Sequence, residues 1–168
     1  MKTDKKVIAY KDLPSLRKKA DGMDKKIVMT TGCYDILHLG HVVHFNYCKS
    51  RGDWLVVSVG NDKCVKTLKG PDRPINDESF RARMMAALEC VDFVVISEEM
   101  GIMDHNKLIA LLRPDFYVVP GTDARLVEKT KLVEKNGGKL IACRRLPPGH
   151  LKGGISTTKI DAKLKGGV

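Results

Sequence analysis

Aromatic residues are scarce in this sequence, and no long apolar run interrupts it. Phenylalanine, tyrosine and tryptophan make up 5% of the 168 residues, and they do not alternate with basic residues along any stretch. Proteins that hold single-stranded nucleic acid stack the bases on aromatic side chains inside a basic groove, so this composition argues against such a platform. No segment approaches the roughly 20 consecutive apolar residues that cross a membrane. We therefore expect neither a nucleic acid nor a membrane as partner.

Paired cysteines and a secretory signal are missing as well. The five cysteines are an odd number without a C-x-x-C pair, which favours reduced thiols over a disulfide framework. The first 26 residues are charged throughout and lack the apolar core of a signal peptide. These two absences predict a cytoplasmic protein.

Acidic residues are outnumbered by basic ones. Lysine and arginine total 30 against 20 aspartates and glutamates, so the formal net charge is +10. A positive field attracts phosphate groups, whether they belong to nucleic acid, to nucleotides or to phosphorylated metabolites. Because aromatic and basic residues do not interleave, small phosphorylated ligands are favoured. A basic nucleic-acid-binding protein stays open as the alternative from a different class.

Short apolar runs rich in valine and isoleucine alternate with helical patterns along the chain. Continuous apolar strands separated by helices indicate a parallel sheet that is covered on both faces. With right-handed crossovers this predicts an α/β fold with a doubly wound, parallel, five-stranded Rossmann-like sheet. Ligands of such sheets bind at the carboxyl ends of the strands, where the winding reverses. The five expected strands are KIVMTT (26–31), DWLVVSVG (53–60), DFVVIS (92–97), DFYVVP (115–120) and KLIACRRL (139–146).

Helical patterns fill the segments between these strands. In residues 76–91, Asp77 suits a helix N-cap, and Phe80, Met84 and Leu88 follow at intervals of four residues. This spacing predicts that the three apolar side chains form the buried stripe of the helix. Further helices are expected at 41–49, at 103–113 before Pro114, at 124–138 with a stop at Gly137, and from about 156.

Three of the five histidines fall in the run TTGCYDILHLGHVVHF, residues 30–45. On a helix, His38 and His44 lie about 120° apart, so three histidines at this spacing cannot converge on one metal ion. A zincin would need an i, i+4 pair with an intervening glutamate, and neither is present. We expect His44 in the core. His38 and His41 flank Gly40 at the expected helix start, where unpaired N–H groups and the helix dipole favour an anion, so we predict a phosphate clamp.

The residues from Thr30 to His41 resemble the G-x-[FY]-D-x-x-H-x-G-H signature of the cytidylyltransferase-like nucleotidyltransferases. The tetrapeptide H-x-G-H alone is a weak signal, but here it follows a buried strand and is preceded by Gly-x-Tyr-Asp. The resemblance continues in the same order from about residue 27 to 162. The three further motifs are the lysine loop NDKCVKTLKGPDRPIN with the helix RARMMAALECVD, the strand and loop RPDFYVVPGTD, and the second signature GGISTTKI.

The resemblance implies the catalytic residues. In this family the two signature histidines contact the nucleotide phosphates and stabilise the transition state at the α-phosphorus, which assigns that role to His38 and His41. It also implies that Lys66 and Lys69, in the loop after the second strand, reach the triphosphate and the incoming phosphate. Arg81 matches the arginine of the next helix and would support the phosphate site, with a surface ion pair as the alternative.

Further residues match positions that surround the nucleotide in the family. Cys33 and Tyr34 would line it through backbone groups, and Gly40 would let a phosphate approach the helix start closely. Asp35 would orient the histidines or a Mg²⁺ ion, or make only a turn hydrogen bond. The remaining matches are Gly121 and Asp123, in the loop that contacts base or ribose, and Ile155, Ser156, Thr157 and Thr158, in the cradle for the β- and γ-phosphates.

The implied organisation is one nucleotidyltransferase domain over residues 1–168, with 1–26 as an N-terminal extension and 27–165 as the catalytic core. The implied partners are an NTP that arrives with Mg²⁺ and a small phosphorylated sugar or polyol. Because relatives are commonly dimers, a homodimer is implied by analogy. A dinucleotide-dependent oxidoreductase would share the sheet, but it needs G-x-G-x-x-G after the first strand, where this chain has TGCYDILHLGH.

The motifs leave several substrate pairs open. The run VKTLKGPDRPIND is similar to that of heptose-1-phosphate adenylyltransferases, which favours ATP and heptose 1-phosphate, with ADP-heptose and pyrophosphate as products. GISTTKI is closer to glycerol-3-phosphate cytidylyltransferases, which use CTP, and archaeal-type FAD synthases are a third candidate. Two positions depart from family patterns. Pro120 stands where relatives often carry the lysine of K-G-G-D, and the arginine of R-T-E-G-I-S-T is absent, with Lys152 or His150 as candidate substitutes.

Overall fold

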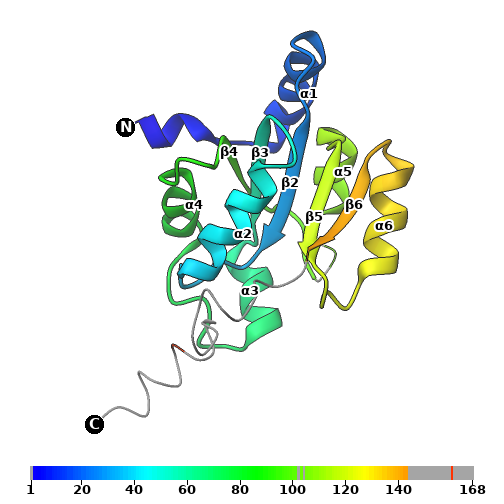
Figure 1. Ribbon diagram of the computed structural model, residues 1–168. Coiled ribbons are helices and arrows are strands. Elements are labelled where there is room, and N and C mark those ends of the chain that lie inside the picture. The colour runs from blue at the N-terminus through cyan, green and yellow to red at the C-terminus, as the bar shows by residue number, and fades with distance from the viewer. Residues whose placement is uncertain (1, 102, 104, 144–159, 161–168) are drawn as a thin grey trace.

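A parallel sheet with helices on both faces organises the chain (Figure 1). The computed structural model describes residues 2–101, 103, 105–143 and 160. Within that part all neighbouring strands pair in parallel, in the order β1-β4-β3-β2-β5-β6. The predicted doubly wound α/β class is thereby confirmed. The strands are β1 (Val7–Ile8), β2 (Ile27–Gly32), β3 (Trp54–Val59), β4 (Phe93–Ile96), β5 (Phe116–Pro120) and β6 (Lys139–Cys143).

The described sheet has six strands, so the predicted number of five was wrong. The additional strand is β1, which pairs at the sheet edge with Val7 opposite Val94 and Ile8 opposite Val95. A two-residue strand is too short to show an alternating pattern, and this one lies within a charged segment. Its pairing with β4 could not be read from the local sequence.

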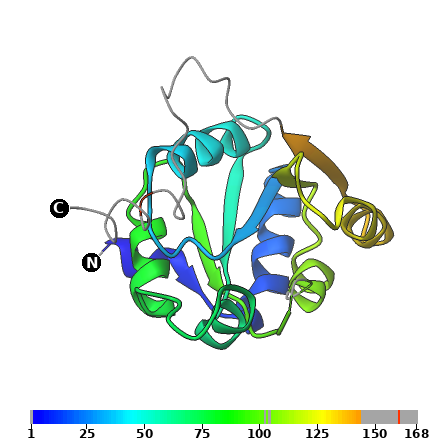
Figure 2. The same cartoon turned by 90° about the horizontal axis from the view of Figure 1, so that it is seen from below.

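Two helical layers cover the sheet (Figure 2). Strand residues alternate between the layers, with Ile27 and Met29 in one apolar cluster and Val28 in the other. This alternation explains the continuous apolar runs, because both faces of each central strand are buried. The first cluster involves α1 (Leu13–Gly22), α5 (Asn106–Leu112) and α6 (Leu126–Lys135), and the second involves α2 (Leu39–Lys49) and α4 (Glu78–Ala86).

The N-terminal segment contributes to the first of these clusters. Tyr10, Leu13, Leu16 and Ala20 are buried there together with residues of α5. Arg17 is also buried, and it forms an ion pair of 2.8 Å with Asp115 just before β5. Charged residues on the exposed side of α1 mask its apolar stripe, so the sequence did not show this helix.

Helix α4 begins where it was predicted but buries a different face. Asp77 caps it by accepting a hydrogen bond from the backbone N–H of Phe80 at 2.8 Å, which confirms the predicted N-cap. The predicted buried stripe was wrong, because the Phe80 side chain is 56% exposed. Burial of a charged side chain, Arg81, rotates the helix relative to its apolar pattern. The residues it buries are Arg81, Ala82, Met85 and Ala86.

The segment after β3 is helical, although the sequence analysis placed Lys66 and Lys69 in a loop. Helix α3 spans Asp62–Lys69 and lies beyond the carboxyl ends of the strands (Figure 1). The side chain of Asn61 caps it by accepting from the N–H of Cys64 at 2.8 Å. This Asn cap and the two buried residues of α3, Cys64 and Val65, explain the helix.

The later helices end as predicted. Helix α5 ends at Leu112, followed by Arg113 in the left-handed region and then by Pro114. Helix α6 ends at Lys135, and Gly137 takes a positive φ of 86° two residues later. The start of the last predicted helix lies outside the described residues, apart from Ile160. Among the helices in the described ranges, none has the length and apolar character that a bilayer crossing would require.

Candidate active site

Strands β2 and β5 are neighbours at the point where the sheet reverses its winding, and they pair through Val28–Phe116 and Met29–Tyr117 in their amino-terminal halves. Strand β2 pairs with β3 on one side and with β5 on the other. The chain therefore extends the sheet from β2 in one direction through β3 and β4, and then in the opposite direction through β5 and β6. In doubly wound sheets this switch point is where ligands bind. The loop after β2 leads to the histidines, and the loop after β5 contains Gly121 and Asp123.

The two signature histidines form a stacked pair at the start of α2. His38 is the N-cap residue, and its ring centroid lies 3.8 Å from that of His41, with an angle of 20° between the rings. Tyr34 contacts the second ring edge-on at 5.2 Å. The Nδ1 atoms of both histidines are shielded from solvent and have no hydrogen-bond partner among the described residues. A buried polar atom without a partner is costly, so these nitrogens suit a ligand.

Burial favours the neutral form of both imidazoles. Burial and, to a smaller extent, the neighbouring His38 and His44 together lower the pKa of His41 to about 4. Burial also lowers the pKa of His38. Each neutral ring has one donor and one acceptor nitrogen. Each ring can therefore donate a hydrogen bond to a phosphate oxygen. The Nδ1 atoms have no carboxylate partner among the described residues that would have to be displaced first.

His44 is half-buried and hydrogen-bonded inside the protein. Its Nε2 lies 2.9 Å from the Oγ1 of Thr30, and its Nδ1 lies 3.4 Å from the Sγ of Cys143. The ring thus joins α2 to the ends of β2 and β6. These contacts match the structural role that the sequence analysis expected for this histidine.

Asp35 attaches the loop after α3 to the loop before α2. Its Oδ2 accepts a hydrogen bond from Nη1 of Arg73 at 2.7 Å, and its Oδ1 accepts from the backbone N–H groups of Ile75 at 2.8 Å and Asn76 at 3.2 Å. Only 6% of this residue is exposed. Both carboxylate oxygens are occupied, so among the sequence alternatives the contacts favour a positioning role over metal binding.

Arg81 is fully buried and joins three segments of the site. Its Nε donates to the carbonyl of Asn76 at 2.9 Å, its Nη1 to the carbonyl of Cys33 at 2.5 Å, and its Nη2 to Oδ1 of Asp62 at 2.6 Å. The ion pair predicted as the alternative is present, but it is not on the surface, because the arginine side chain has no exposed area. Arg81 holds the loop after β2 against the first turn of α3.

Tyr34 shapes the turn between β2 and the histidines. It adopts a positive φ of 50°, which is uncommon for a residue other than glycine. Its ring folds over Gly32, where a Cβ atom would lie only 2.7 Å from the ring carbon Cζ. A glycine at position 32 is therefore required for this turn.

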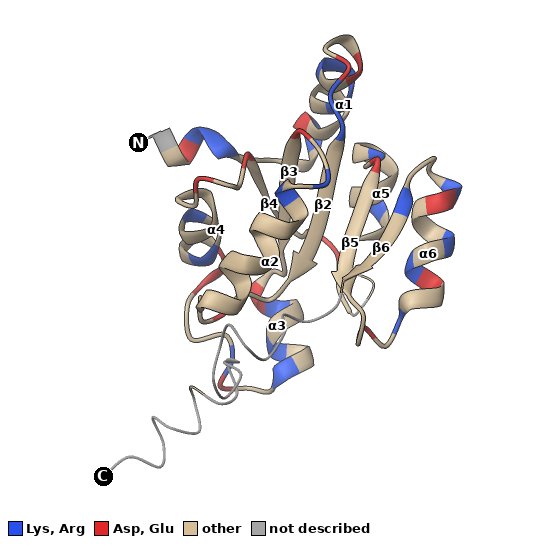
Figure 3. Ribbon diagram, in the orientation of Figure 1, with Lys and Arg blue, Asp and Glu red and all other residues tan. Residues whose placement is uncertain are grey.

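Lys66 and Lys69 lie on the exposed face of α3. No ion pair joins either of them to another residue in the described part of the chain. Figure 3 shows the basic residues of α3, whereas α2 carries no charged residue before Lys49. The lysines are thus solvated cations near the histidine end of the sheet.

The loop after β5 is held by backbone and side-chain contacts. The N–H of Gly121 donates to the carbonyl of Cys143 at 2.7 Å. The carboxylate of Asp123 accepts from the Nζ of Lys129 at 2.7 Å and from the N–H of Arg125 at 2.9 Å. Partial burial opposes ionisation of Asp123, but these two hydrogen bonds outweigh it and the pKa is lowered. The loop therefore carries an ionised, well-ligated carboxylate.

The second signature cannot be placed. Ile155, Ser156, Thr157 and Thr158 lie outside the described residues, as do Lys152 and His150. In the described ranges, no group of three or more histidine, cysteine, aspartate or glutamate side chains is arranged to hold a metal ion. All five cysteines are described, and none of them forms a disulfide.

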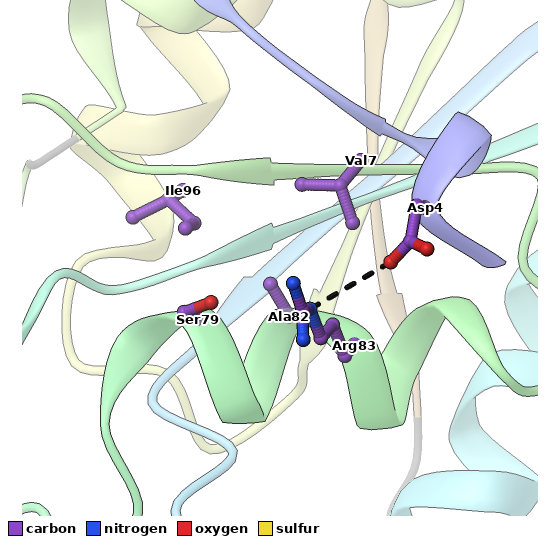
Figure 4. Close-up of a pocket in the computed structure, with 6 residues that line it drawn as sticks. All are labelled: Asp4, Val7, Ser79, Ala82, Arg83 and Ile96. Carbon is purple, nitrogen blue, oxygen red and sulfur yellow. Dashed lines mark ion pairs between the residues drawn. The ribbon is translucent and has the colours of Figure 1, made fainter. Parts of the chain in front are cut away.

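A pocket of about 280 Å³ lies away from this site, between α4 and the N-terminal segment (Figure 4). An ion pair of 3.7 Å between Asp4 and Arg83 crosses it. None of the predicted site residues lines this pocket. The lining residues are Asp4, Val7, Ser79, Ala82, Arg83 and Ile96.

Sequence reasoning missed four residues that shape the site: Asp62, Arg73, Asn76 and Lys129. Arg73 and Asn76 belong to the Arg-Pro-Ile-Asn turn, which the sequence analysis noted without assigning a role. The Arg-Pro-Ile-Asn run could therefore have pointed to Arg73 and Asn76 as residues that shape the site. Asp62 and Lys129 carried none, because a lone charged residue on a helix is usually solvated.

Comparison with protein families and curated relatives agrees with the family resemblance of the sequence motifs. A model of the cytidylyltransferase-like family matches residues 29–163. The chain is 42% identical over 165 residues to the bifunctional protein HldE of Campylobacter jejuni (strain RM1221), which covers 98% of this chain and 32% of that protein. It is 39% identical over 168 residues to HldE of Vibrio cholerae serotype O1 (strain ATCC 39541). That alignment covers 98% of this chain and 33% of the Vibrio protein. The chain spans about a third of the length of these relatives.

Solved structures share the fold. The lipopolysaccharide core biosynthesis protein from Thermoplasma volcanium has a TM-score of 0.61 and 29% identity, covering 73% of this chain and 97% of that one. The pantoate-beta-alanine ligase from Francisella tularensis has the same TM-score at 17% identity, covering 95% and 76%, and shows similarity of fold alone.

Proposed function

Since this chain belongs to the cytidylyltransferase-like family and is a nucleotidyltransferase, we propose that it transfers a nucleoside monophosphate from an NTP to a phosphorylated sugar or polyol. An oxygen of the acceptor phosphate attacks the α-phosphorus, the bond to the β-phosphate bridging oxygen breaks, and pyrophosphate leaves. The observation that carries the proposal is the stacked His38–His41 pair at the start of α2, whose Nδ1 atoms are shielded from solvent and whose pKa values are lowered.

The two imidazoles suit this reaction because they are already in place. Donors that are fixed and shielded from water stabilise charge on the transferring phosphoryl group without reorganising during the reaction. The helix start adds the unpaired N–H groups of the first turn. Catalysis then depends on positioning and charge stabilisation, as in other phosphoryl transfers.

The lysines of α3 complete the proposed phosphate site. Lys66 and Lys69 carry their charge on flexible stems, so they can follow the triphosphate and the incoming phosphate. Arg81 and Asp35 serve as positioning residues, because their polar groups are occupied by Cys33, Asp62 and the loop at 73–76. The second signature, residues 155–158, is proposed to hold the β- and γ-phosphates.

We favour ATP and heptose 1-phosphate as substrates, giving ADP-heptose. The run VKTLKGPDRPIND supports this pair, and so do curated relatives at about 40% identity that are named HldE. A sugar acceptor also fits a structural relative that is named for lipopolysaccharide core biosynthesis. The wording GISTTKI keeps CTP and glycerol 3-phosphate as the second candidate pair.

Mg²⁺ is proposed to arrive with the nucleotide. The site's two described aspartates near the histidines, Asp35 and Asp62, are engaged by arginines, and no acidic cluster is present in the described ranges. Mg²⁺ is commonly held by substrate phosphates and water, which fits such a site. When bound, the ion would neutralise charge on the phosphates. We further propose a cytoplasmic homodimer, on the family resemblance and the absence of disulfides among the five cysteines.

Pyrophosphate release tests the function directly. ATP and CTP are each combined with heptose 1-phosphate, glycerol 3-phosphate or FMN in the presence of Mg²⁺. Turnover is expected with ATP and heptose 1-phosphate. Turnover with CTP and glycerol 3-phosphate alone would reassign the substrates. No pyrophosphate from any pair, together with retention on a DNA column at physiological salt, would favour the nucleic-acid-binding alternative.

A further inference from the structure

A nearly buried lysine faces the loop after β5. Lys129 lies in the first half of α6, and only 5% of the residue is exposed. Its Nζ pairs with Oδ2 of Asp123 at 2.7 Å, and the two side chains are 7% and 16% exposed. The ammonium also lies 5.9 Å from the ring centroid of Tyr117. None of the sequence motifs includes this lysine.

Stability alone does not explain a buried pair of this kind. Removing two charges from water costs about as much as their attraction returns, and apolar replacements of buried pairs are often neutral or stabilising. A lysine ammonium has three donors, of which Asp123 takes one. In the described part of the chain, Asp123 is its one ion-pair partner. The pair is better explained by what it holds in place.

The pair holds the turn at residues 121–123. The carboxylate that Lys129 engages also accepts from the N–H of Arg125, and the N–H of Asp123 donates to the carbonyl of Pro120 at 2.9 Å. The other end of the turn is tied to β6 through Gly121. The lysine thus anchors one side of a short turn at the carboxyl end of β5.

Strand β5, which leads into this turn, lies next to the strand that leads to the histidines. Strands β5 and β2 are neighbours, with Met29 opposite Tyr117. The Tyr117 hydroxyl lies 2.8 Å from Oγ1 of Thr31, one residue before the end of β2. Lys129 therefore sits above a tyrosine that connects the turn to the strand carrying the signature loop.

The sequence offers a reason for a lysine on this helix. Pro120, the last residue of β5, supplies neither a charge nor a backbone N–H to the loop that follows it. Lys129 brings an ammonium to the same loop from α6 instead.

We propose that Lys129 is a positioning residue for nucleotide binding: through Asp123 it holds the turn at 121–123 in the shape that receives the nucleoside part of the NTP. This inference rests on the proposed function. It assigns Lys129 to the binding of the nucleotide and not to the transfer step, because the pair lies on the β5 loop and not at the histidines.

The test compares Lys129→Met with Lys131→Met, which removes an exposed lysine from the same helix. We measure KM for ATP, kcat, and the Kd of Mg-ATP by titration calorimetry without acceptor. Lys129→Met is expected to raise KM and Kd about tenfold, the usual size of a lost charge-assisted contact, with kcat changed less than about threefold. Lys131→Met should match the unaltered protein, and Lys129→Arg should fall between the two.

The outcomes separate the inference from the proposed function. If the unaltered protein turns over an NTP and Lys129→Met keeps its KM and Kd, or loses kcat alone, the positioning role is wrong and the function stands. If the unaltered protein binds no NTP and releases no pyrophosphate, the function itself is wrong. Thermal unfolding checks that Lys129→Met folds; if it does not, Lys129→Gln decides, since it removes the charge but keeps a hydrogen-bond donor, and an unchanged KM there would overturn the inference.

Discussion

Two helices bring the candidate catalytic side chains to the site, and they do so in opposite ways. On α2, His38 and His41 are stacked, shielded from solvent at Nδ1 and neutral. On α3, Lys66 and Lys69 are exposed and have no ion-pair partner within the described residues. Helix α2 therefore presents hydrogen-bond donors that are fixed in place, whereas α3 presents lysine charges on flexible side chains.

The difference determines how each group can contribute. A side chain that is already ordered loses little entropy when a ligand binds, whereas an exposed lysine must give up much of its rotamer freedom. Exposed charges also act through a high dielectric and are screened by salt. We therefore expect the histidines to dominate the rate and the lysines to adjust affinity, with Arg81 linking the loop after β2, at Cys33, to α3, at Asp62.

The largest effect should follow His41→Ala. Removing a preorganised donor at a site of developing charge lowers kcat by about 10²- to 10³-fold. The fold should change little, because no described residue is hydrogen-bonded to the Nδ1 of His41 and none would lose a partner there when the ring is removed. Asn46→Ala, an exposed change on the same helix, is the control. Activity within tenfold of the unaltered protein would place catalysis elsewhere.

Arg81→Met should have the next largest effect, because it breaks the link between the loop after β2 and α3. The carbonyls of Cys33 and Asn76 lose their donors, and we expect a loss of about 3 kcal/mol in the free energy of unfolding. Urea denaturation measures this loss, and kcat should also fall as α3 shifts. Arg83→Met, which removes an arginine that is 63% exposed from the same helix, should change stability by less than about 0.5 kcal/mol. Equal effects of the two variants would contradict the assigned role.

Acid should weaken the fold through His41. Its pKa is about 4 in the folded protein and about 6.5 in an unfolded chain. As the pH falls from 6.5 to 4, the unfolded state binds a proton that the folded state does not, so stability decreases in this window. We expect a loss of between about 1 and 3 kcal/mol, measured by denaturation at pH 7 and pH 4.5. His41→Asn should show a flatter profile; an unchanged profile would mean that the ring is not buried as described.

The smallest effects are expected for Lys66→Met and Lys69→Met. Each removes a solvated charge, so KM for the phosphorylated substrates should rise by about tenfold or less. The difference should shrink at high ionic strength, because salt screens exposed charges. Lys135→Met, an exposed change on α6, is the control. If either lysine variant lost as much kcat as His41→Ala, the lysines would contribute to the rate as strongly as the histidines, and the expected difference between α2 and α3 would be wrong.

Local patterns predicted most of the fold and the identity of the central histidines. Continuous apolar runs gave five of the six described strands, and Asp77 marked the start of α4. Two of the failures had a common cause. Strand β1 and the buried face of α4 depend on partners far away in the chain, such as Val94 for Val7 and Cys33 for Arg81. Periodicity reports only which side of an element is apolar, so it could not show these partners.

The amino-acid sequence by itself determined the order of the predicted strands along the chain, the Gly-x-Tyr-Asp turn before α2 and the two histidines at the start of that helix. These depend on side chains within a few residues of one another. The tertiary structure decided that the imidazoles are stacked and neutral, that Arg81 is buried between Cys33 and Asp62, and that Lys129 reaches Asp123. Burial and ion pairing are properties of the packed molecule, because a charge is shielded from water only when distant segments close around it.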